Sequence, residues 1–243
     1  MHKDDYFIGR EVYMRVYADN AATTYLSDVA LNTLLDCLKN YNGNPNSLHT
    51  DGQITQEKLD ESRAKVAKAL NAAKPNEIYF TSGGSEADNQ ALISAARGLV
   101  KKGKKHLISL NIEHHAILHT LRKLEKEGFE VTLLKPQPNG IVDVKDVEDA
   151  IREDTALVSI MFANNEMGAI QPIAEIGKLC REKGVLFHTD AVQAAAHLPI
   201  DVQAMNIDML SLSAHKFHGP KGVGVLYARN GIRLINVIEG GAQ

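Results

Sequence analysis

The sequence predicts an α/β fold, with a doubly wound and mostly parallel sheet that carries helices on both faces. Short β-rich apolar runs alternate with amphipathic segments from residue 77 onward. The runs are almost continuously apolar, as expected for strands buried on both faces. Several helical segments end at a glycine just before the next run. With 243 residues, of which 44% are hydrophobic, the chain is long enough to bury a sizeable core.

The expected elements follow in order. Candidate strands are EIYFTS (77–82), HLISL (106–110), EVTLLK (130–135), ALVSIMF (156–162), VLFHTDA (185–191), DMLSLSA (208–214) and VGVLYA (223–228). Candidate helices between them are Ala87–Lys102, Ala116–Glu127, Val144–Arg152 and Ile173–Lys183. This alternation implies parallel strands, whose carboxyl ends gather ligands in folds of this kind.

Two further helices are expected before residue 77. Ser27–Leu38 begins at a serine cap, and Ile54–Leu70 follows the loop NGNPNSLHTDG (42–52). The first helix places four leucines on one apolar face, namely Leu31, Leu34, Leu35 and Leu38. Cys37 belongs to this face and Cys180 to the helix before VLFHTDA, and both are expected to be core thiols.

The expected organisation is an extension over residues 1–14, an N-terminal helical segment over 15–76 and a ligand-binding domain over 77–243. The 27 basic and 30 acidic residues give a net charge of -3, which favours neither nucleic acid nor anionic membrane as a partner. No signal peptide or membrane span is evident. The two cysteines are far apart and lack zinc-ligand spacing, so we expect a cytoplasmic protein without a metal site.

Lys216 gives the sharpest chemical signal, in SLSAHKFHGPKGVG (211–224). A lysine just past a buried strand, with cationic neighbours, can lose its proton and attack a carbonyl carbon. The alternative is an exposed turn lysine. The stretch GPKGVG also resembles a phosphate-binding loop, but no serine or threonine follows Lys221.

Asp190, in the motif HTDAVQ (188–193), falls at the carboxyl end of the apolar strand that begins with VLF (185–187). A carboxylate there suits pyridoxal phosphate (PLP), because it keeps the pyridine nitrogen protonated. A helix cap or an ordinary ion pair would also explain it. Gly84 and Ser85 in FTSGGSEA stand between a strand and a helix, where backbone amides bind phosphate, although simple helix capping is the alternative.

His114 in EHH and Asn165 in NNEMG also follow expected strands. An imidazole can stack on an aromatic ring and move protons, and an asparagine can donate to a phenolate oxygen. Taken singly, each is more often a cap or a turn residue. A metal site built from His114, His115, His188, His215 and His218 has no supporting ligand spacing. Together, five strand ends offer an amine, a carboxylate, phosphate donors, an imidazole and an amide, which suits PLP.

Seven motifs of this sequence resemble, in the same order, the motifs of cysteine desulfurases. They are YADNAATT, NGNPNSLHTDG, FTSGGSEADN, EHHAIL, NNEMGAIQPI, HTDAVQ and SAHKFHGPKGVG. These enzymes belong to the class V aminotransferase group of type I PLP enzymes, and the resemblance covers Arg15 to Gln243. It implies the type I PLP-transferase large domain, with the C-terminal small domain absent from a chain truncated at its C-terminus.

The resemblance also implies a role for each matching residue. Lys216 would be the Schiff-base lysine, Asp190 the pyridinium partner, and His114 the ring-stacking group and proton shuttle. Asn165 and Gln193 would contact the phenolic oxygen. The phosphate would be held by Gly84, Ser85, Ser213 and His215, with Ser85 standing where the family usually has threonine.

The implied reaction converts L-cysteine to L-alanine and leaves the sulfur on an enzyme cysteine as a persulfide, for iron-sulfur cluster or thiolation pathways. A homodimer and a sulfur-acceptor or scaffold protein are the implied partners. The family's catalytic cysteine and substrate-binding arginine have no counterpart in this sequence, so the isolated chain is expected to be inactive. The alternatives are a selenocysteine lyase or another class V enzyme, and a non-catalytic scaffold that keeps the fold.

Overall fold

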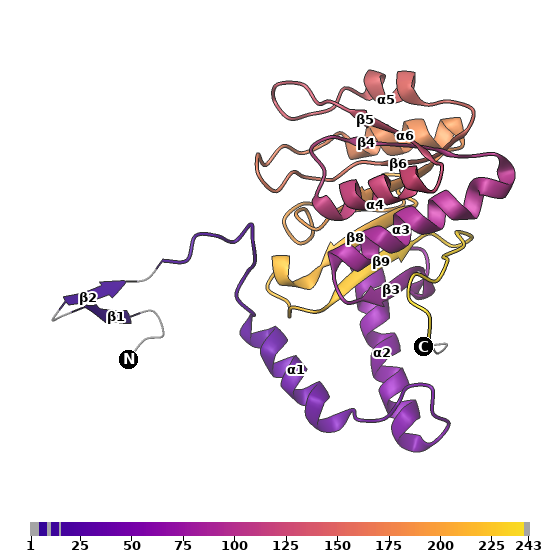
Figure 1. Cartoon of the computed structure of the whole chain (residues 1–243). Helices are drawn as coiled ribbons and strands as arrows, with labels where there is room; N and C mark the ends of the chain where they lie inside the picture. The colour runs from indigo at the N-terminus through magenta and orange to yellow at the C-terminus, as the bar shows by residue number, and fades with distance from the viewer. Residues whose placement is uncertain (1–4, 9–10, 15, 241–243) are drawn as a thin grey trace.

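A computed structural model describes residues 5–8, 11–14 and 16–240. Its main body is a seven-stranded sheet in the order β3-β9-β8-β7-β6-β4-β5 (Figure 1). The strands are β3 (Ile78–Thr81), β4 (His106–Leu110), β5 (Glu130–Leu134), β6 (Thr155–Ser159), β7 (Leu186–Asp190), β8 (Met209–Ser213) and β9 (Gly224–Ala228). These bounds confirm the expected strands to within a few residues, and they give the mixed α/β sheet that the sequence predicts.

The helices are α1 (Asp28–Asn40), α2 (Thr50–Ala69), α3 (Gly84–Leu99), α4 (His115–Lys126), α5 (Val144–Ala150) and α6 (Ile173–Lys183). Three short 3-10 turns lie at Pro75–Glu77, Val100–Lys102 and Ala214–Lys216. No helix in the described ranges is long and apolar enough to cross a membrane.

Two apolar cores sandwich the sheet, because successive side chains of a strand point to opposite faces. Leu107 and Leu157 pack with α3 and α4 on one face. Their strand neighbours Ile108 and Val158 pack on the other face, with α6 and Phe187. Helices therefore cover both faces, as the sequence predicts for a doubly wound sheet.

One strand departs from the parallel arrangement. β9 runs antiparallel to both of its neighbours, β8 and β3. The link between β8 and β9 contains no helix that could carry the chain back across the sheet, so the strand returns in the opposite direction. The strands β3, β4, β6, β7 and β8 still share one direction, and their carboxyl ends meet at one edge.

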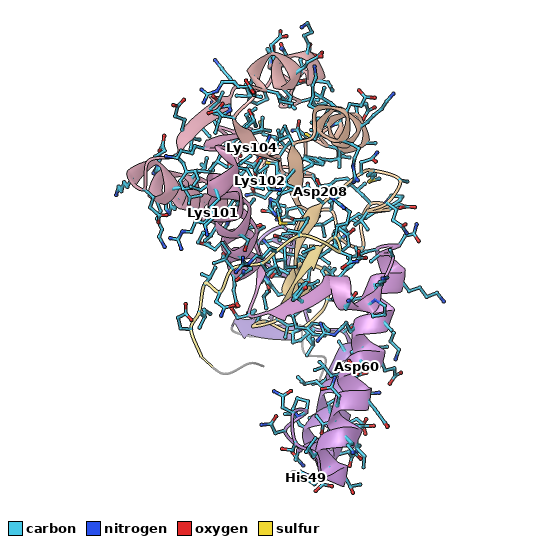
Figure 2. The ribbon with its side chains drawn as sticks, turned by 90° about the vertical axis from the view of Figure 1, so that its right-hand side faces the viewer. His49, Asp60, Lys101, Lys102, Lys104 and Asp208 are labelled. Atoms are coloured by element: carbon cyan, nitrogen blue, oxygen red, sulfur yellow. The ribbon has the colours of Figure 1, made fainter. Side chains whose placement is uncertain are left out.

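The N-terminal region differs most from expectation. The segment treated as an extension contains a two-stranded antiparallel hairpin of β1 (Asp5–Ile8) and β2 (Glu11–Met14), drawn apart from the sheet in Figure 1. α2 begins at Thr50, inside the expected loop, because the His49 side chain accepts a hydrogen bond from the Gly52 amide and caps the helix. Asp60 lies on the part of α2 that projects from the body, and His49 lies at the tip, just before the helix begins (Figure 2).

The leucine face of α1 is not buried in this chain. Leu38 is 65% exposed and Leu34 is 38% exposed, and no described residue of α1 is buried. Cys37 is half-buried on this helix, so its placement as a core thiol was wrong. The amphipathic pattern predicts the helix correctly, but it does not say whether the body of the same chain covers the apolar face. Cys180 is buried, as expected.

Candidate active site

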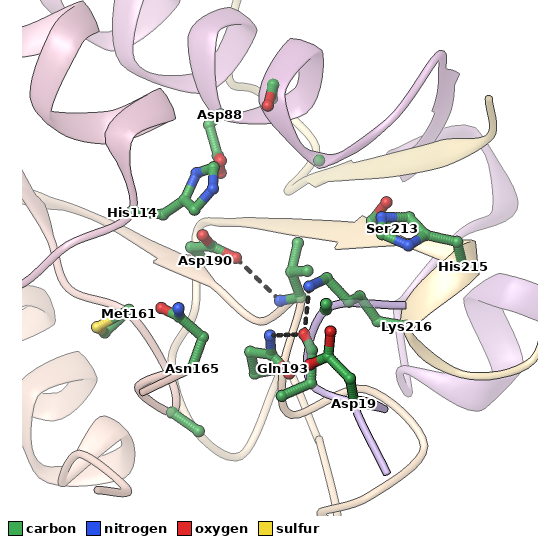
Figure 3. A pocket seen from close by; sticks show the side chains of 16 residues that line it. Asp19, Asp88, His114, Met161, Asn165, Asp190, Gln193, Ser213, His215 and Lys216 are labelled. Atoms are coloured by element: carbon green, nitrogen blue, oxygen red, sulfur yellow. Dashed lines mark hydrogen bonds between the residues drawn. The ribbon is translucent and has the colours of Figure 1, made fainter. Parts of the chain in front are cut away.

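A cavity of about 490 Å³ opens at the carboxyl ends of the strands β3, β4, β6, β7 and β8. Every residue that the sequence predicts for cofactor binding lines it, namely Gly84, Ser85, His114, Asn165, Asp190, Gln193, Ser213, His215 and Lys216 (Figure 3). They come from the ends of β3, β4, β6, β7 and β8 and from the segments that follow these strands. The expectation that these segments meet at one crevice is therefore met in the structure.

Lys216 ends the 3-10 turn that follows β8, and its amine points into the cavity (Figure 3). The Nζ atom donates a hydrogen bond to the carbonyl oxygen of Ala21. Burial lowers the pKa of the Lys216 amine from its ordinary value, while the charges of Asp190 and Asp19 act in the opposite direction. The free-base fraction of this amine is therefore larger than that of an exposed lysine.

Asp190 closes β7 and is 7% exposed. Its Oδ1 accepts a hydrogen bond from the amide of Val192 at 2.9 Å, which fixes the orientation of the carboxyl group. Burial raises the pKa of Asp190, against the lowering effects of that hydrogen bond and of the charges of His114 and Lys216. A cationic group bound in the cavity would favour the ionised carboxylate further.

A candidate anion-binding site, here called the cradle, lies at the start of α3. Gly83 precedes the helix, and no side chain in the described part of the chain caps its first amides. A Cβ on Gly84 would stand 2.7 Å from Cγ2 of Val192, so a larger residue does not fit there. Gly224 on β9 allows a similarly close approach, because its Cβ would stand 2.5 Å from the backbone of Gly83. Free helix N-terminal amides attract negative charge, phosphate in particular.

The end of β8 faces this cradle with Ser213 and His215 (Figure 3). The His215 Nδ1 atom lies 3.0 Å from the hydroxyl oxygen of Thr23. Burial, followed by the charges of Lys216 and Lys221, lowers the pKa of His215, so the ring is neutral near pH 7 and offers one N–H donor.

His114 caps α4, and its Nδ1 accepts a hydrogen bond from the amide of Ala116 at 3.1 Å. That bond fixes the ring at the cavity, near Asp190 in Figure 3. The amide side chains of Asn165 and Gln193 enter from the opposite side. Gln193 Nε2 donates to the carbonyl oxygen of Ala21 at 2.9 Å. The N-terminal segment around Ala21 therefore closes one wall of the cavity.

Two acidic residues of the cavity were not singled out from the sequence. Asp19 lies in the motif YADNAATT and Asp88 in FTSGGSEADN, and both line the cavity. Asp88 stands four residues after Gly84, which places it on the same face of α3. A carboxylate on a helix face that is otherwise apolar was the available signal. Asp19 reaches the cavity through a tertiary contact that no sequence period reveals.

Other polar residues of the same motifs serve elsewhere. Asn164 is structural: its Oδ1 accepts from the amides of Glu166 and Met167. His115 packs against His119 on α4, with ring centroids 5.2 Å apart and the ring planes tilted by 45°. Across the described ranges, no group of three or more histidine, cysteine or acidic residues is arranged to hold a metal ion.

Comparison with known proteins identifies the family. Residues 16–242 match the model of the class V aminotransferases. The chain is 56% identical over 229 residues to "Cysteine desulfurase IscS" of Clostridium botulinum. This alignment covers 94% of the present chain and 57% of the relative. The protein of the same name from Methanosarcina thermophila is 50% identical over 228 residues, and that alignment covers 94% of this chain and 56% of the relative. The chain thus spans a little over half the length of these curated relatives.

Solved structures agree with this assignment. "SspA in complex with cysteine" superposes with a TM-score of 0.89 at 41% identity, over 93% of this chain and 65% of that one. A structure described as "NIFS-LIKE PROTEIN" gives a TM-score of 0.90 at 41% identity, over 95% of this chain and 63% of that one. The chain therefore belongs to the class V aminotransferases, a family of PLP-dependent enzymes, and its relatives within that family are cysteine desulfurases.

Proposed function

We propose that this chain forms the cofactor site of a PLP-dependent cysteine desulfurase, which converts L-cysteine to L-alanine and transfers the sulfur to an enzyme thiol. One observation carries the proposal. An amine of lowered pKa, a buried carboxylate and a helix N-terminus without a side-chain cap surround the same cavity. The names of the relatives support cysteine as the substrate, since one neighbour is described in complex with cysteine.

The donor set fits each part of PLP. The cradle at Gly84 and Ser85, with Ser213 and His215 opposite, would hold the phosphate by backbone amides and side-chain donors. Asp190 would accept a hydrogen bond from the protonated pyridine nitrogen and so keep that nitrogen protonated. Gly84 packs closely against Val192, and there is no room for a Cβ at this position of the cradle. An anion there would therefore lie directly against backbone amides.

When bound, PLP supplies an electron sink that stabilises negative charge at the substrate carbon. The chain's own residues would bind the cofactor and move protons. Lys216 would hold the cofactor through Nζ, and once displaced by substrate that amine could accept or return a proton. Burial lowers the pKa of this amine and so enlarges its unprotonated fraction, which favours such a role.

His114 and the two amides would orient the ring. The His114 imidazole is fixed by the Ala116 amide, which leaves its Nε2 side free to carry a proton at the cavity. Gln193 uses one N–H on the Ala21 carbonyl and keeps the second for an oxygen in the cavity. Asn165 would donate to the same oxygen.

The sulfur-accepting thiol is proposed to lie outside the segment shared with the relatives. Cys180 is buried, and burial raises its pKa to about 12, so it is not a nucleophile at neutral pH. Cys37 lies on α1 and is not among the residues that line the cavity. In the whole protein we expect a homodimer, a sulfur-acceptor or scaffold partner in iron-sulfur cluster assembly or thiolation, and a cytoplasmic location.

The substrate proposal is tested with the PLP-loaded chain and the two enantiomers of cysteine. Both enantiomers react equally with free PLP, so D-cysteine is a matched control for chemistry in solution. We expect L-cysteine to change the visible spectrum at lower concentration than D-cysteine, and Lys216→Ala to abolish this difference. Equal responses to both enantiomers in a loaded, folded chain would contradict the proposed substrate.

A further inference from the structure

Three carboxyl groups are buried at one side of the cavity. Asp88 comes from α3, Glu113 from the segment after β4 and Asp190 from the end of β7, and they are 1%, 5% and 7% exposed. Like charges in a water-poor site raise one another's pKa, so they cannot all be ionised near neutral pH. The question is which of the three carries the negative charge.

The surroundings of Asp88 favour its neutral form. Its Oδ1 is fully buried and has no hydrogen-bond partner among the described residues. Burial, followed by the charge of Asp190, raises the pKa of Asp88 well above its ordinary value, and a hydrogen bond from the Ser211 side chain opposes this shift only in part. Nε2 of His188 lies 3.8 Å from Oδ1 of Asp88. That ring is itself fully buried, between the hydroxyls of Ser159 and Ser211 at 2.9 and 3.0 Å. Burial lowers the pKa of His188 to about 3, so it is uncharged and gives Asp88 no compensating cation.

Glu113 has a similar environment. Its Oε1 accepts a hydrogen bond from the amide of Met161 at 2.7 Å, as a carbonyl oxygen would. Its Oε2 is buried and lacks a partner within the described part of the chain. Burying a charged carboxylate oxygen without a hydrogen-bond donor is much more costly than burying a neutral carboxylic acid in the same place.

Asp190 has a different environment. One oxygen is held by the Val192 amide, and the carboxyl group faces the cavity that contains Lys216 and His114. Both of these groups lower its pKa. Of the three carboxyl groups, Asp190 is therefore the one best placed to be ionised, provided that its two neighbours are not.

We infer that Asp88 is a positioning residue for Asp190: it is held as a neutral carboxylic acid beside the cavity, so that the single negative charge of the cluster resides on Asp190. Asp88 acts through its neighbour, since an ionised Asp88 would move the proton onto Asp190. The groups that face Asp88 are Asp190 and His188 on β7 and Glu113 after β4, with Lys216 and His114 facing Asp190. The inference rests on the proposed function only for the role of Asp190.

The test uses infrared spectroscopy of the full chain without cofactor at neutral pH. A protonated carboxyl group gives a carbonyl band that ionised carboxylates lack. We expect Asp88→Asn to remove one such band and Glu113→Gln another. Asp60→Asn, at an exposed position on α2, is expected to remove none. Loss of no band in Asp88→Asn would overturn the inference.

A second readout follows the thermal unfolding midpoint. A neutral Asp88 makes the folded state bind a proton that the unfolded chain releases, so the wild-type midpoint falls as pH rises toward 8. Asp88→Asn should fall less steeply than wild type, and an equal slope would overturn the inference. If Asp88→Asn does not fold, the double variant Glu113→Gln with Asp190→Asn is used instead. It should still show the infrared carbonyl band of the protonated Asp88, and absence of this band would overturn the inference.

Failure of the proposed function would look different. A chain that does not bind PLP at Lys216 would contradict the cofactor proposal and leave the infrared result unchanged. A chain that binds PLP at Lys216 but shows no acid band from Asp88 would contradict the present inference alone.

Discussion

A single methyl group at Gly84 should disturb the cofactor site while the fold remains. In Gly84→Ala the new Cβ would lie 2.7 Å from Cγ2 of Val192, a short β-branched side chain with little freedom to move. Val192 also holds the Asp190 carboxyl through its amide, so any shift is passed to that group. Overpacking of this kind costs about 1–3 kcal/mol. Taken as lost binding energy, that is about 5- to 150-fold weaker affinity for PLP.

Gly98→Ala is the matched control, because it makes the same change in the last turns of the same helix. The nearest atom to its Cβ would be 4.0 Å away, at the Arg233 carbonyl oxygen. Alanine is favoured over glycine in helices by about 0.5–1 kcal/mol, so this variant should be slightly stabilised and bind PLP normally. Affinity is measured by PLP absorption and stability by urea denaturation. Equal PLP affinity in the two variants would refute the packing argument.

Three further results are expected. Burial raises the pKa values of Asp88, Glu113 and Asp190, so the folded chain without cofactor holds protons that the unfolded chain loses above about pH 4. Its free energy of unfolding should therefore fall as pH rises, by up to about 1.4 kcal/mol per pH unit for each proton; a flat profile in urea denaturation would contradict this. Iodoacetamide at neutral pH should label Cys37 before Cys180, as read by mass spectrometry, and equal labelling of the folded chain would count against the buried thiol. Asp208→Asn should lower the free energy of unfolding by about 1–3 kcal/mol. The Asp208 carboxyl group accepts hydrogen bonds from the Phe187 amide at 2.9 Å and from the Arg229 side chain at 2.7 Å. An unchanged urea midpoint would argue against a stabilising role for these two hydrogen bonds.

The sheet and the polar side chains at its strand ends could be predicted from the sequence because both depend on local signals. Buried parallel strands are nearly continuous apolar runs, and a polar residue directly after such a run must lie at the carboxyl end. Asp190, Lys216 and Gly84 were located in this way, without knowledge of the strand order. Glycine at the start of α3 likewise indicated a close backbone approach, which its packing against Val192 requires.

Tertiary relations could not be predicted in this way. The antiparallel direction of β9 depends on a short connection, and a strand's own sequence does not encode its direction. The Leu38 face of α1 is amphipathic, but the pattern does not specify what covers it. Asp88 was overlooked because helical carboxylates are usually solvated. Its burial depends on the packing of α3 against β7 and β8, which brings His188 within 3.8 Å.

The most direct test of the central claim is to map the residue that binds PLP. PLP is added to the purified chain, the product is reduced with borohydride, and the modified peptide is identified by mass spectrometry, with Lys216→Ala as the control. A label confined to Lys216, and lost in the variant, is the predicted result. Label spread over surface lysines, or an unlabelled chain that is folded by circular dichroism, would contradict the assignment of this cavity as a PLP site.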